Sequence, residues 1–162
     1  MIQKVISNDD ILITAKLALC IWNEHYVPMI GQEQVDYMIK NFQSPEVIEN
    51  QINHENYEYF IIYHQSLPSG YIAIKQRGNE LFLSKFYVIK EKRGTGLGRE
   101  GMDFIALKGR EFGAGKITLT VNKNNVNSIK AYEKMGFVNV GSVIADIGEG
   151  YVMDDFVMKL DL

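Results

Sequence analysis

A strand, a glycine-rich loop, a helix and a second strand follow one another in the middle of the chain, and this unit constrains the fold most. The stretch 79–89 has the β-branched and aromatic residues of a strand, and the loop KEKRGTGLGREG (90–101) leads into a helix that Gly113 and Gly115 end. KITLTV (116–121) is the next strand. This order favours one parallel pair of strands inside a mixed sheet.

The rest of the sequence predicts antiparallel strands and further helices around this unit. Residues 56–64 and 70–77 resemble a hairpin, with QSLPSG between them. The stretch 11–25 is apolar on most faces, which predicts a well-buried helix ended by Pro28 and Gly31. The remaining predicted elements are a strand at 2–7, helices at 32–42, 44–52 and 125–135, and strands at 136–145 and 150–160.

We therefore expect an α+β fold: a central, twisted, mixed but mostly antiparallel sheet of about seven strands flanked by helices. Neither an internal repeat nor a linker divides the sequence, so we expect one domain over residues 1–162.

Composition limits the function classes. A formal net charge of -3 lacks the basic excess of a nucleic-acid-binding protein. The apolar stretch 11–22 contains a lysine and is too short to span a bilayer, and the N-terminus does not resemble a secretory signal. Cys20 is the single cysteine and cannot form an internal disulfide, so we expect a cytoplasmic protein with Cys20 as a buried core thiol.

The glycine loop predicts phosphate binding, since glycines allow close approach and a helix N-terminus favours anions; a plain tight turn is the alternative. A triphosphate-binding P-loop is excluded, because no glycine of the loop precedes Lys-Ser or Lys-Thr. Gly96, Gly98 and Gly101 match the dinucleotide fingerprint, but Asn122 follows the next strand where that site needs an acid. Coenzyme A, which also carries a pyrophosphate, is the third candidate.

Two motifs together favour coenzyme A. Arg93-Gly94-Thr95-Gly96-Leu97-Gly98 resembles the R/Q-x-x-G-x-G/A signature of the GNAT superfamily of N-acetyltransferases. The stretch 121–137 is similar to the second hallmark of that superfamily, N-x-x-[AS]-x-x-x-Y-x-K-x-G-F. The matching residues are Asn125, Ser128, Tyr132, Lys134, Gly136 and Phe137. The resemblance covers the whole chain, in both motifs and order of elements.

The resemblance implies acetyl-CoA as the cofactor and a V-shaped splay between the strands at 80–89 and 116–121. Phe86, Tyr87 and Val88 would bind the pantetheine arm in the manner of an added strand. The backbone of residues 93–98 would bind the pyrophosphate, and Asn125 would bond the pantetheine or act as a helix N-cap. The full set of implied cofactor-binding residues is Phe86, Tyr87, Val88, Arg93, Gly94, Thr95, Gly96, Leu97, Gly98, Arg99, Asn125, Ser128 and Lys134.

The resemblance implies Tyr132 as the catalytic residue, a general acid for the thiolate that leaves, because a phenol is protonated at neutral pH. An aromatic core residue is the alternative. The Val88 N–H would stabilise the oxyanion. The general base is open: Glu80 stands at the start of its strand, which favours water or an acceptor-side carboxylate such as Glu24, Asp154 or Asp155.

The implied substrate is a primary amine of a small molecule, polyamine or peptide, and the acidic balance slightly favours polyamines. Trp22, Tyr26, Tyr151 and Asp154 are implied to line its pocket, and a homodimer is common in such proteins. We expect no nucleic-acid or membrane partner, and no metal, because His25, His54 and His64 lack ligand spacing. The alternative function is an acyl-CoA-binding or sensing module without catalysis, and a dinucleotide oxidoreductase is a more distant one.

Overall fold

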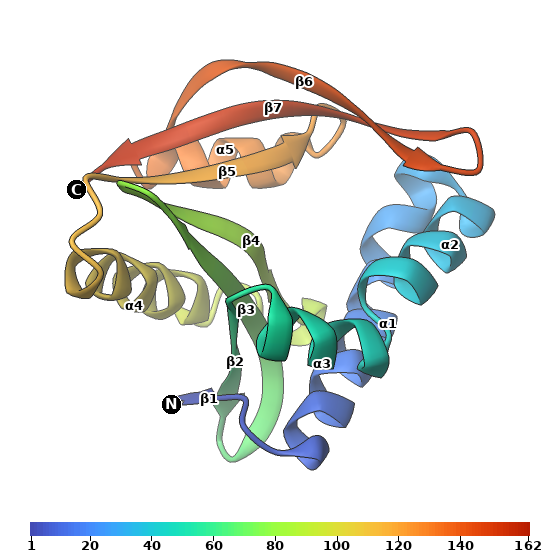
Figure 1. Ribbon diagram of the computed structural model, residues 1–162, viewed down its shortest axis with the longest axis horizontal. Coiled ribbons are helices and arrows are strands. Elements are labelled where there is room, and N and C mark those ends of the chain that lie inside the picture. Colours follow the sequence, from blue (N-terminus) through green and yellow to red (C-terminus); the bar gives the residue numbers. More distant parts are fainter. The chain divides into compact units, whose positions relative to one another are not determined.

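The computed structural model describes residues 1–162, and its elements follow the predicted order (Figure 1). The strands are β1 (Ile2–Lys4), β2 (Tyr57–His64), β3 (Leu67–Arg77), β4 (Glu80–Val88), β5 (Lys116–Asn122), β6 (Val138–Gly148) and β7 (Tyr151–Asp161). The helices are α1 (Asn8–Ile30), α2 (Gln32–Phe42), α3 (Pro45–His54), the short 3-10 helix η1 (Lys90–Lys92), α4 (Leu97–Glu111) and α5 (Val126–Lys134).

The seven strands form one mixed sheet in the order β1-β2-β3-β4-β5-β7-β6, which confirms the predicted α+β class. The pairs β1–β2, β2–β3, β5–β7 and β6–β7 are antiparallel. The pair β4–β5 is parallel, as the strand–helix–strand order predicted. Its register runs from Glu80 opposite Lys116 to Phe82 opposite Thr118.

The chain divides into two compact units, which we describe separately. The first comprises residues 1–75 and 83–105, and the second comprises residues 76–82 and 106–162. Both β4 and α4 contribute residues to each unit.

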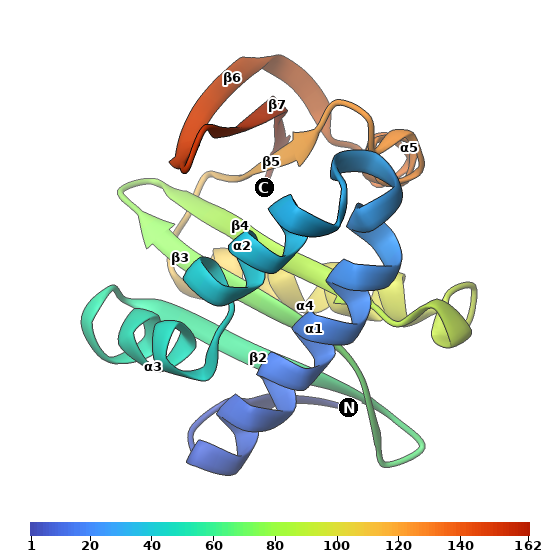
Figure 2. The same ribbon diagram turned by 90° about the vertical axis from the view of Figure 1, so that its right-hand side faces the viewer.

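In the first unit, helices cover both faces of the strands. Figure 2 shows α1, α2 and α3 in front of β2 and β3, with α4 behind. The alternation of β2 matches this layering: the Tyr59 hydroxyl lies 3.1 Å from the Gln43 Nε2, at the end of α2, whereas the neighbouring Phe60 ring packs edge-on against Phe104 of α4 at 4.9 Å. Tyr59 and Phe60 therefore belong to opposite buried layers of this unit.

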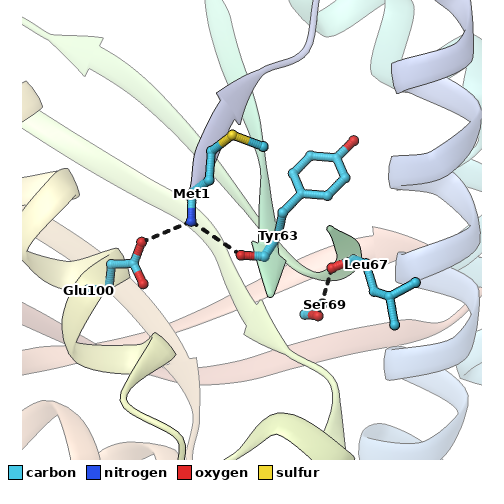
Figure 3. A network of polar contacts seen from close by, with 5 residues as sticks. All are labelled: Met1, Tyr63, Leu67, Ser69 and Glu100. Atoms are coloured by element: carbon cyan, nitrogen blue, oxygen red, sulfur yellow. Dashed lines mark hydrogen bonds and ion pairs between the residues drawn. The ribbon is translucent and has the colours of Figure 1, made fainter. Parts of the chain in front are cut away.

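At the edge of this unit, polar contacts of Met1 join the N-terminus to neighbouring elements (Figure 3). The Met1 ammonium lies 3.2 Å from the Tyr63 carbonyl oxygen and 3.2 Å from the Glu100 Oε1 in the first turn of α4. In the same region the buried Ser69 donates its hydroxyl to the Leu67 carbonyl at 2.9 Å. The two Met1 contacts link the residue that precedes β1 to both β2 and α4.

The β2–β3 hairpin is tighter than the sequence predicted. The loop consists of Gln65 and Ser66, whose φ values of 50° and 65° are those of a two-residue type I′ turn. Leu67 already pairs with His64, so residues 67–70 of the predicted loop QSLPSG are part of β3. Gly70 consequently lies inside a strand.

Helix α1 begins with a capping box. The Asp10 N–H donates to the Ser7 hydroxyl at 3.1 Å, and the Asp10 carboxylate accepts the Ile6 and Ser7 N–H groups, each at 3.0 Å. At the other end the helix continues through Pro28, and Gly31, with a φ of 85°, ends it. The prediction was therefore right for Gly31 and wrong for Pro28.

Two predictions for α1 are wrong. The helix is not well buried all round, because Leu12 and Leu19 are 49% and 52% exposed, and Cys20 is exposed rather than in the core. Only the face that carries Ala18 and Ile21 is fully buried. Apolar periodicity shows which residues can be buried, but it does not show how many neighbouring elements cover the helix. None of the helices combines the length and apolarity needed to cross a lipid bilayer.

The second unit contains β5, β7 and β6, with α5 and the end of α4. One face of β5 is buried through Ile117, Leu119 and Val121. The packing of α4 onto this layer is close at Gly109, where a Cβ would lie 2.5 Å from the end of the Leu162 side chain. Strands β6 and β7 form an antiparallel hairpin, drawn in orange-red and red in Figure 1. Strand β6 is at the edge of the sheet and is exposed along most of its length.

We expect Asp10→Ala to lower the free energy of unfolding by about 1–2 kcal/mol at pH 7, because it leaves two N–H groups without their acceptor. The bonds from the Ile6 and Ser7 backbone lower the pKa of Asp10 against the effect of burial. A depressed folded pKa contributes stability above the unfolded value of about 3.9, and that stability is lost as pH falls through the folded pKa. Urea unfolding at several pH values should show the difference from wild type disappear in acid.

The matched control for this prediction is Asp9→Ala, which removes an exposed carboxylate from the same helical turn. It should change stability by a few tenths of a kcal/mol, as expected for the helix dipole alone. Equal effects of the two variants, or an Asp10 effect independent of pH, would contradict the role given to the capping box.

Candidate active site

The glycine loop connects the end of β4 to α4 in a conformation that requires glycine. Gly94 and Gly96 have φ values of 79° and 93°, in the region that other residues avoid. Leu97, the first residue of α4, is 4% exposed and anchors the loop to the protein. The loop therefore leads the backbone directly into a helix N-terminus, as the phosphate-binding prediction requires.

The start of α4 offers hydrogen-bond donors for an anion. The first intrahelical bond runs from the Glu100 N–H to the Gly96 carbonyl at 3.0 Å, so the N–H groups of Leu97, Gly98 and Arg99 have no acceptor within the helix. The helix dipole favours a negative charge at this position. Thr95 differs from these groups, because its hydroxyl donates to the Lys92 carbonyl at 2.6 Å within the loop.

The last residues of β4 have a defined orientation. The Ile89 N–H donates to the Ser69 carbonyl of β3 at 2.9 Å, and the Arg93 Nε donates to the Val88 carbonyl at 3.2 Å. Successive N–H groups of a strand point to opposite edges. Because the Ile89 N–H points toward β3, the Val88 N–H points away from it.

Three aromatic residues predicted for the site lie together in the first unit. The Trp22 and Tyr26 rings of α1 are 6.0 and 6.2 Å from the Tyr87 ring of β4, and the Tyr26 and Tyr87 hydroxyl oxygens are 3.0 Å apart. Trp22 and Tyr26 are 3% and 7% exposed, whereas Tyr87 is half-buried. The two helix residues therefore form the buried side of an aromatic cluster that reaches the surface at β4. The Lys85 ammonium lies 6.0 Å from the centre of the Trp22 ring.

A buried polar network behind this cluster was missed by the sequence analysis. Tyr71, whose ring is 5.6 Å from that of Tyr87, donates its hydroxyl to the Gln43 Oε1 at 2.8 Å. Gln43 also bonds Tyr59, which in turn donates to Gln51. Burial raises the pKa of both Tyr59 and Tyr71. A glutamine after a helix carries no sequence signal of burial, so only the fold reveals this network.

The second group of predicted residues lies on α5 in the second unit. Asn125 is 3% exposed, and its side-chain oxygen accepts the Ser128 N–H at 3.4 Å, which makes it the N-cap. Tyr132 is half-buried, with its ring packed edge-on at 5.4 Å against Phe137. The Tyr132 carbonyl accepts the Phe137 N–H at 3.0 Å, so two contacts fix the position of Tyr132.

The other predicted residues of this unit have varied surroundings. Lys134 is exposed in the last turn of α5, and Tyr151 is half-buried at the start of β7. Asp154 is paired with Lys123 at 2.8 Å, whereas the neighbouring Asp155 is 8% exposed and lies opposite Asn122 of β5. Asp155 is thus the buried carboxylate among the residues considered as a base.

Two further predictions concern charged and metal-binding groups. Glu80, the only acid in β4, lies 3.6 Å from the Lys116 Nζ, so a charge partner already holds it. No three His, Cys, Asp or Glu side chains gather closely enough to hold a metal ion.

Comparison with known proteins identifies the family of this chain. Residues 26–153 match the model of the acetyltransferase (GNAT) domain. The PaiA N-acetyltransferase from Thermoplasma acidophilum, solved in complex with coenzyme A, is similar over 100% of this chain and 99% of its own, with a TM-score of 0.79 and 18% identity. A GCN5-related N-acetyltransferase from Rhodopseudomonas palustris has a TM-score of 0.83 and 16% identity, over 100% of this chain and 95% of its own.

A third similar structure is the ribosomal-protein-S18-alanine N-acetyltransferase from Escherichia coli, with a TM-score of 0.73 and 16% identity over 99% of this chain and 92% of its own. These identities show a shared fold, while the family match covers both predicted motifs. The chain therefore belongs to the GNAT acetyltransferases, enzymes that take their acetyl group from acetyl-CoA.

Proposed function

We propose that this acetyltransferase moves the acetyl group of acetyl-CoA directly to a primary amine in a ternary complex, without an acyl-enzyme, and that residues 1–162 act as one domain. The observation that carries the proposal is the continuous path from the end of β4, through Gly94 and Gly96, into the N-terminus of α4. This path places strand amides and helix-terminal amides in sequence, as a ligand with both a pantetheine arm and a pyrophosphate requires.

The pyrophosphate would bind at the loop and the first turn of α4. Backbone N–H groups of residues 93–98 would donate to its oxygens, and the exposed Arg93 and Arg99 would add positive charge. The Arg93 Nε already bonds the Val88 carbonyl, so the terminal nitrogens of its guanidinium would be the ones to bind phosphate. The pantetheine would pair with Phe86, Tyr87 and Val88 as an additional strand.

The Val88 N–H is the proposed donor to the thioester carbonyl. It points away from β3, and a backbone N–H fixed in a strand needs no reorganisation when negative charge develops on that oxygen. The amine nitrogen bonds to the acetyl carbon, the bond from carbon to sulfur breaks, and the thiolate leaves.

Tyr132 is the proposed general acid that protonates this thiolate. A phenol with a reference pKa of about 10 keeps its proton at neutral pH and can donate it to the leaving group. The contacts with Phe137 hold the Tyr132 side chain, and Asn125 and Ser128 lie on the same face of α5. We propose that the Asn125 amide bonds the pantetheine as well as capping the helix, and that Ser128 and Lys134 complete the cofactor site.

The acceptor is proposed to be an amine of a small molecule, polyamine or peptide. Trp22, Tyr26, Tyr151 and Asp154 are the proposed lining, and the net charge of -3 gives cationic acceptors a small advantage. Similar structures include one enzyme that acts on a ribosomal-protein alanine and one nourseothricin acetyltransferase. Amines as different as a peptide and an antibiotic therefore belong in a first screen.

Two further expectations are part of this proposal. An exposed free thiol at Cys20 is compatible with a reducing cytoplasm. A homodimer is supported by exposed apolar residues along the edge strand β6, where Val138, Val140 and Ile144 are 52%, 53% and 68% exposed.

A thiol-release assay with acetyl-CoA and a panel of amines tests the proposed function. The panel should contain polyamines, amino acids, aminoglycoside-type antibiotics and peptides with a free N-terminus. Release of coenzyme A that depends on one class of amine is the expected result. Tight binding of acetyl-CoA with no release for any amine would instead favour the acyl-CoA-sensing module.

We expect Tyr132→Phe to lower kcat by about 10²–10³-fold while the dissociation constant of acetyl-CoA changes little, because the variant loses a proton donor and keeps the ring. Stopped assays with the best amine and calorimetric titration of acetyl-CoA measure the two quantities. Tyr57→Phe, which removes a hydroxyl from a half-buried tyrosine of β2, is the matched control. Unchanged turnover of Tyr132→Phe would exclude this residue as the acid.

We expect Glu80→Gln to leave kcat within about twofold, because the proposed base is water or an acceptor-side carboxylate and not the acid of β4. If solvent takes the proton, kcat/KM should rise with pH toward the pKa of the free amine, near 10 for an alkyl amine. Asp155→Asn is the informative companion, since its carboxylate is buried. A 10²-fold loss for Glu80→Gln, with normal acetyl-CoA binding, would identify Glu80 as the base instead.

A further inference from the structure

Gly70 occupies an unusual place in β3. It is buried, pairs with Ile62 of β2, and is not among the residues with positive φ. Backbone conformation therefore does not explain why glycine stands here. A glycine inside a strand can instead mark a close approach of another backbone segment.

That segment is the end of β4. A Cβ atom built on Gly70 would lie 2.3 Å from the Tyr87 carbonyl oxygen, 3.1 Å from the Val88 Cα and 3.3 Å from the Tyr87 carbonyl carbon. All three atoms belong to the main chain, so no change of rotamer can relieve the collision. The β4 backbone would have to move by roughly 1 Å to reach ordinary contact.

The neighbouring contacts show what this approach achieves. Directly beside Gly70, the Ser69 carbonyl accepts the Ile89 N–H at 2.9 Å. Tyr87 O and Ile89 N thus both face β3, on either side of Val88. The carbonyl of Val88 itself is bound by Arg93 from the glycine loop. The Val88–Ile89 peptide is therefore held by β3 on one edge and by the loop on the other, and the carbonyl oxygen of the preceding Tyr87–Val88 peptide lies against Gly70.

We propose that Gly70 is a positioning residue for acetyl transfer. Its missing side chain allows the Tyr87–Val88 peptide to lie against β3, and this position directs the Val88 N–H at the thioester carbonyl. The inference rests on the proposed function of that N–H. A misplacement of 1 Å in a reacting site can lower the rate about 10²-fold, which is the size of displacement that a Cβ at residue 70 would impose.

The test compares Gly70→Ala with Gly109→Ala. The control adds the same methyl group to a buried glycine, but its Cβ meets only the end of the Leu162 side chain, at 2.5 Å. We expect kcat to fall about 10²-fold for Gly70→Ala and to stay within twofold for Gly109→Ala, with both proteins folded by circular dichroism. Full activity of folded Gly70→Ala would overturn the proposal.

A spectroscopic readout separates positioning from a general loss of structure. Infrared spectra of bound acetyl-CoA labelled with ¹³C at the carbonyl report the hydrogen bond to the thioester oxygen directly. We expect the stretching frequency to be lowered in the wild-type protein and in Gly109→Ala, and to return toward its solution value in Gly70→Ala. A lowered frequency retained in Gly70→Ala would overturn the proposal, even if turnover fell.

A second variant serves if Gly70→Ala does not fold. Ile89 has φ of -58° and ψ of 149°, which proline adopts readily, so Ile89→Pro deletes the N–H that bonds Ser69 without adding bulk beneath Val88. It should also lower kcat and raise the carbonyl frequency, and wild-type values for both would overturn the proposal. The infrared measurement needs no amine, so it tests the positioning role of Gly70 even if no acceptor in the panel reacts.

Discussion

The hydrogen bond from the Ile89 N–H to the Ser69 carbonyl sets the direction of every main-chain group at the end of β4. It attaches the last part of this strand to β3, so the Tyr87 carbonyl also faces β3 and the Val88 N–H faces the opposite edge. The parallel pairing with β5, by contrast, is recorded between Glu80 and Phe82. A strand that ends with one N–H directed away from its antiparallel neighbour can offer that group to a ligand, and the glycine loop follows directly.

The glycine loop adds a second kind of hydrogen-bond donor, the backbone N–H groups at the N-terminus of α4. Gly94 and Gly96 turn the chain so that α4 begins at Leu97, and the buried Leu97 side chain fixes this turn. Arg93 joins the two parts, because its guanidinium bonds the Val88 carbonyl at the end of β4 and belongs to the loop that would hold phosphate. In the proposed complex, Arg93 would therefore contribute both to cofactor binding and to the orientation of the Val88–Ile89 peptide.

The sequence predicted those features that depend on local physics. The Asn125 cap and the positive φ of Gly96 follow from the bonding needs of a few neighbouring residues. The exposure of Cys20 was not predicted, because it depends on which elements cover α1. Gly70 was predicted at the boundary between the loop QSLPSG and the strand 70–77, whereas β3 begins at Leu67 and places Gly70 in its interior, where an isolated glycine signals close backbone contact.

The charged side chains of β4 bear on how the substrate amine loses its proton. The strand offers one carboxylate, Glu80, which lies 3.6 Å from the Lys116 ammonium. Farther along, Lys85 donates to the Ser84 hydroxyl at 2.8 Å, so that part of the strand presents a cation where a base could stand. An ammonium substrate that approached this strand would meet a like charge, whereas a neutral amine would not. For the proposed mechanism, this arrangement of β4 favours an amine that is deprotonated before it reaches the thioester, with the Val88 N–H as the proposed donor and a base from outside the strand.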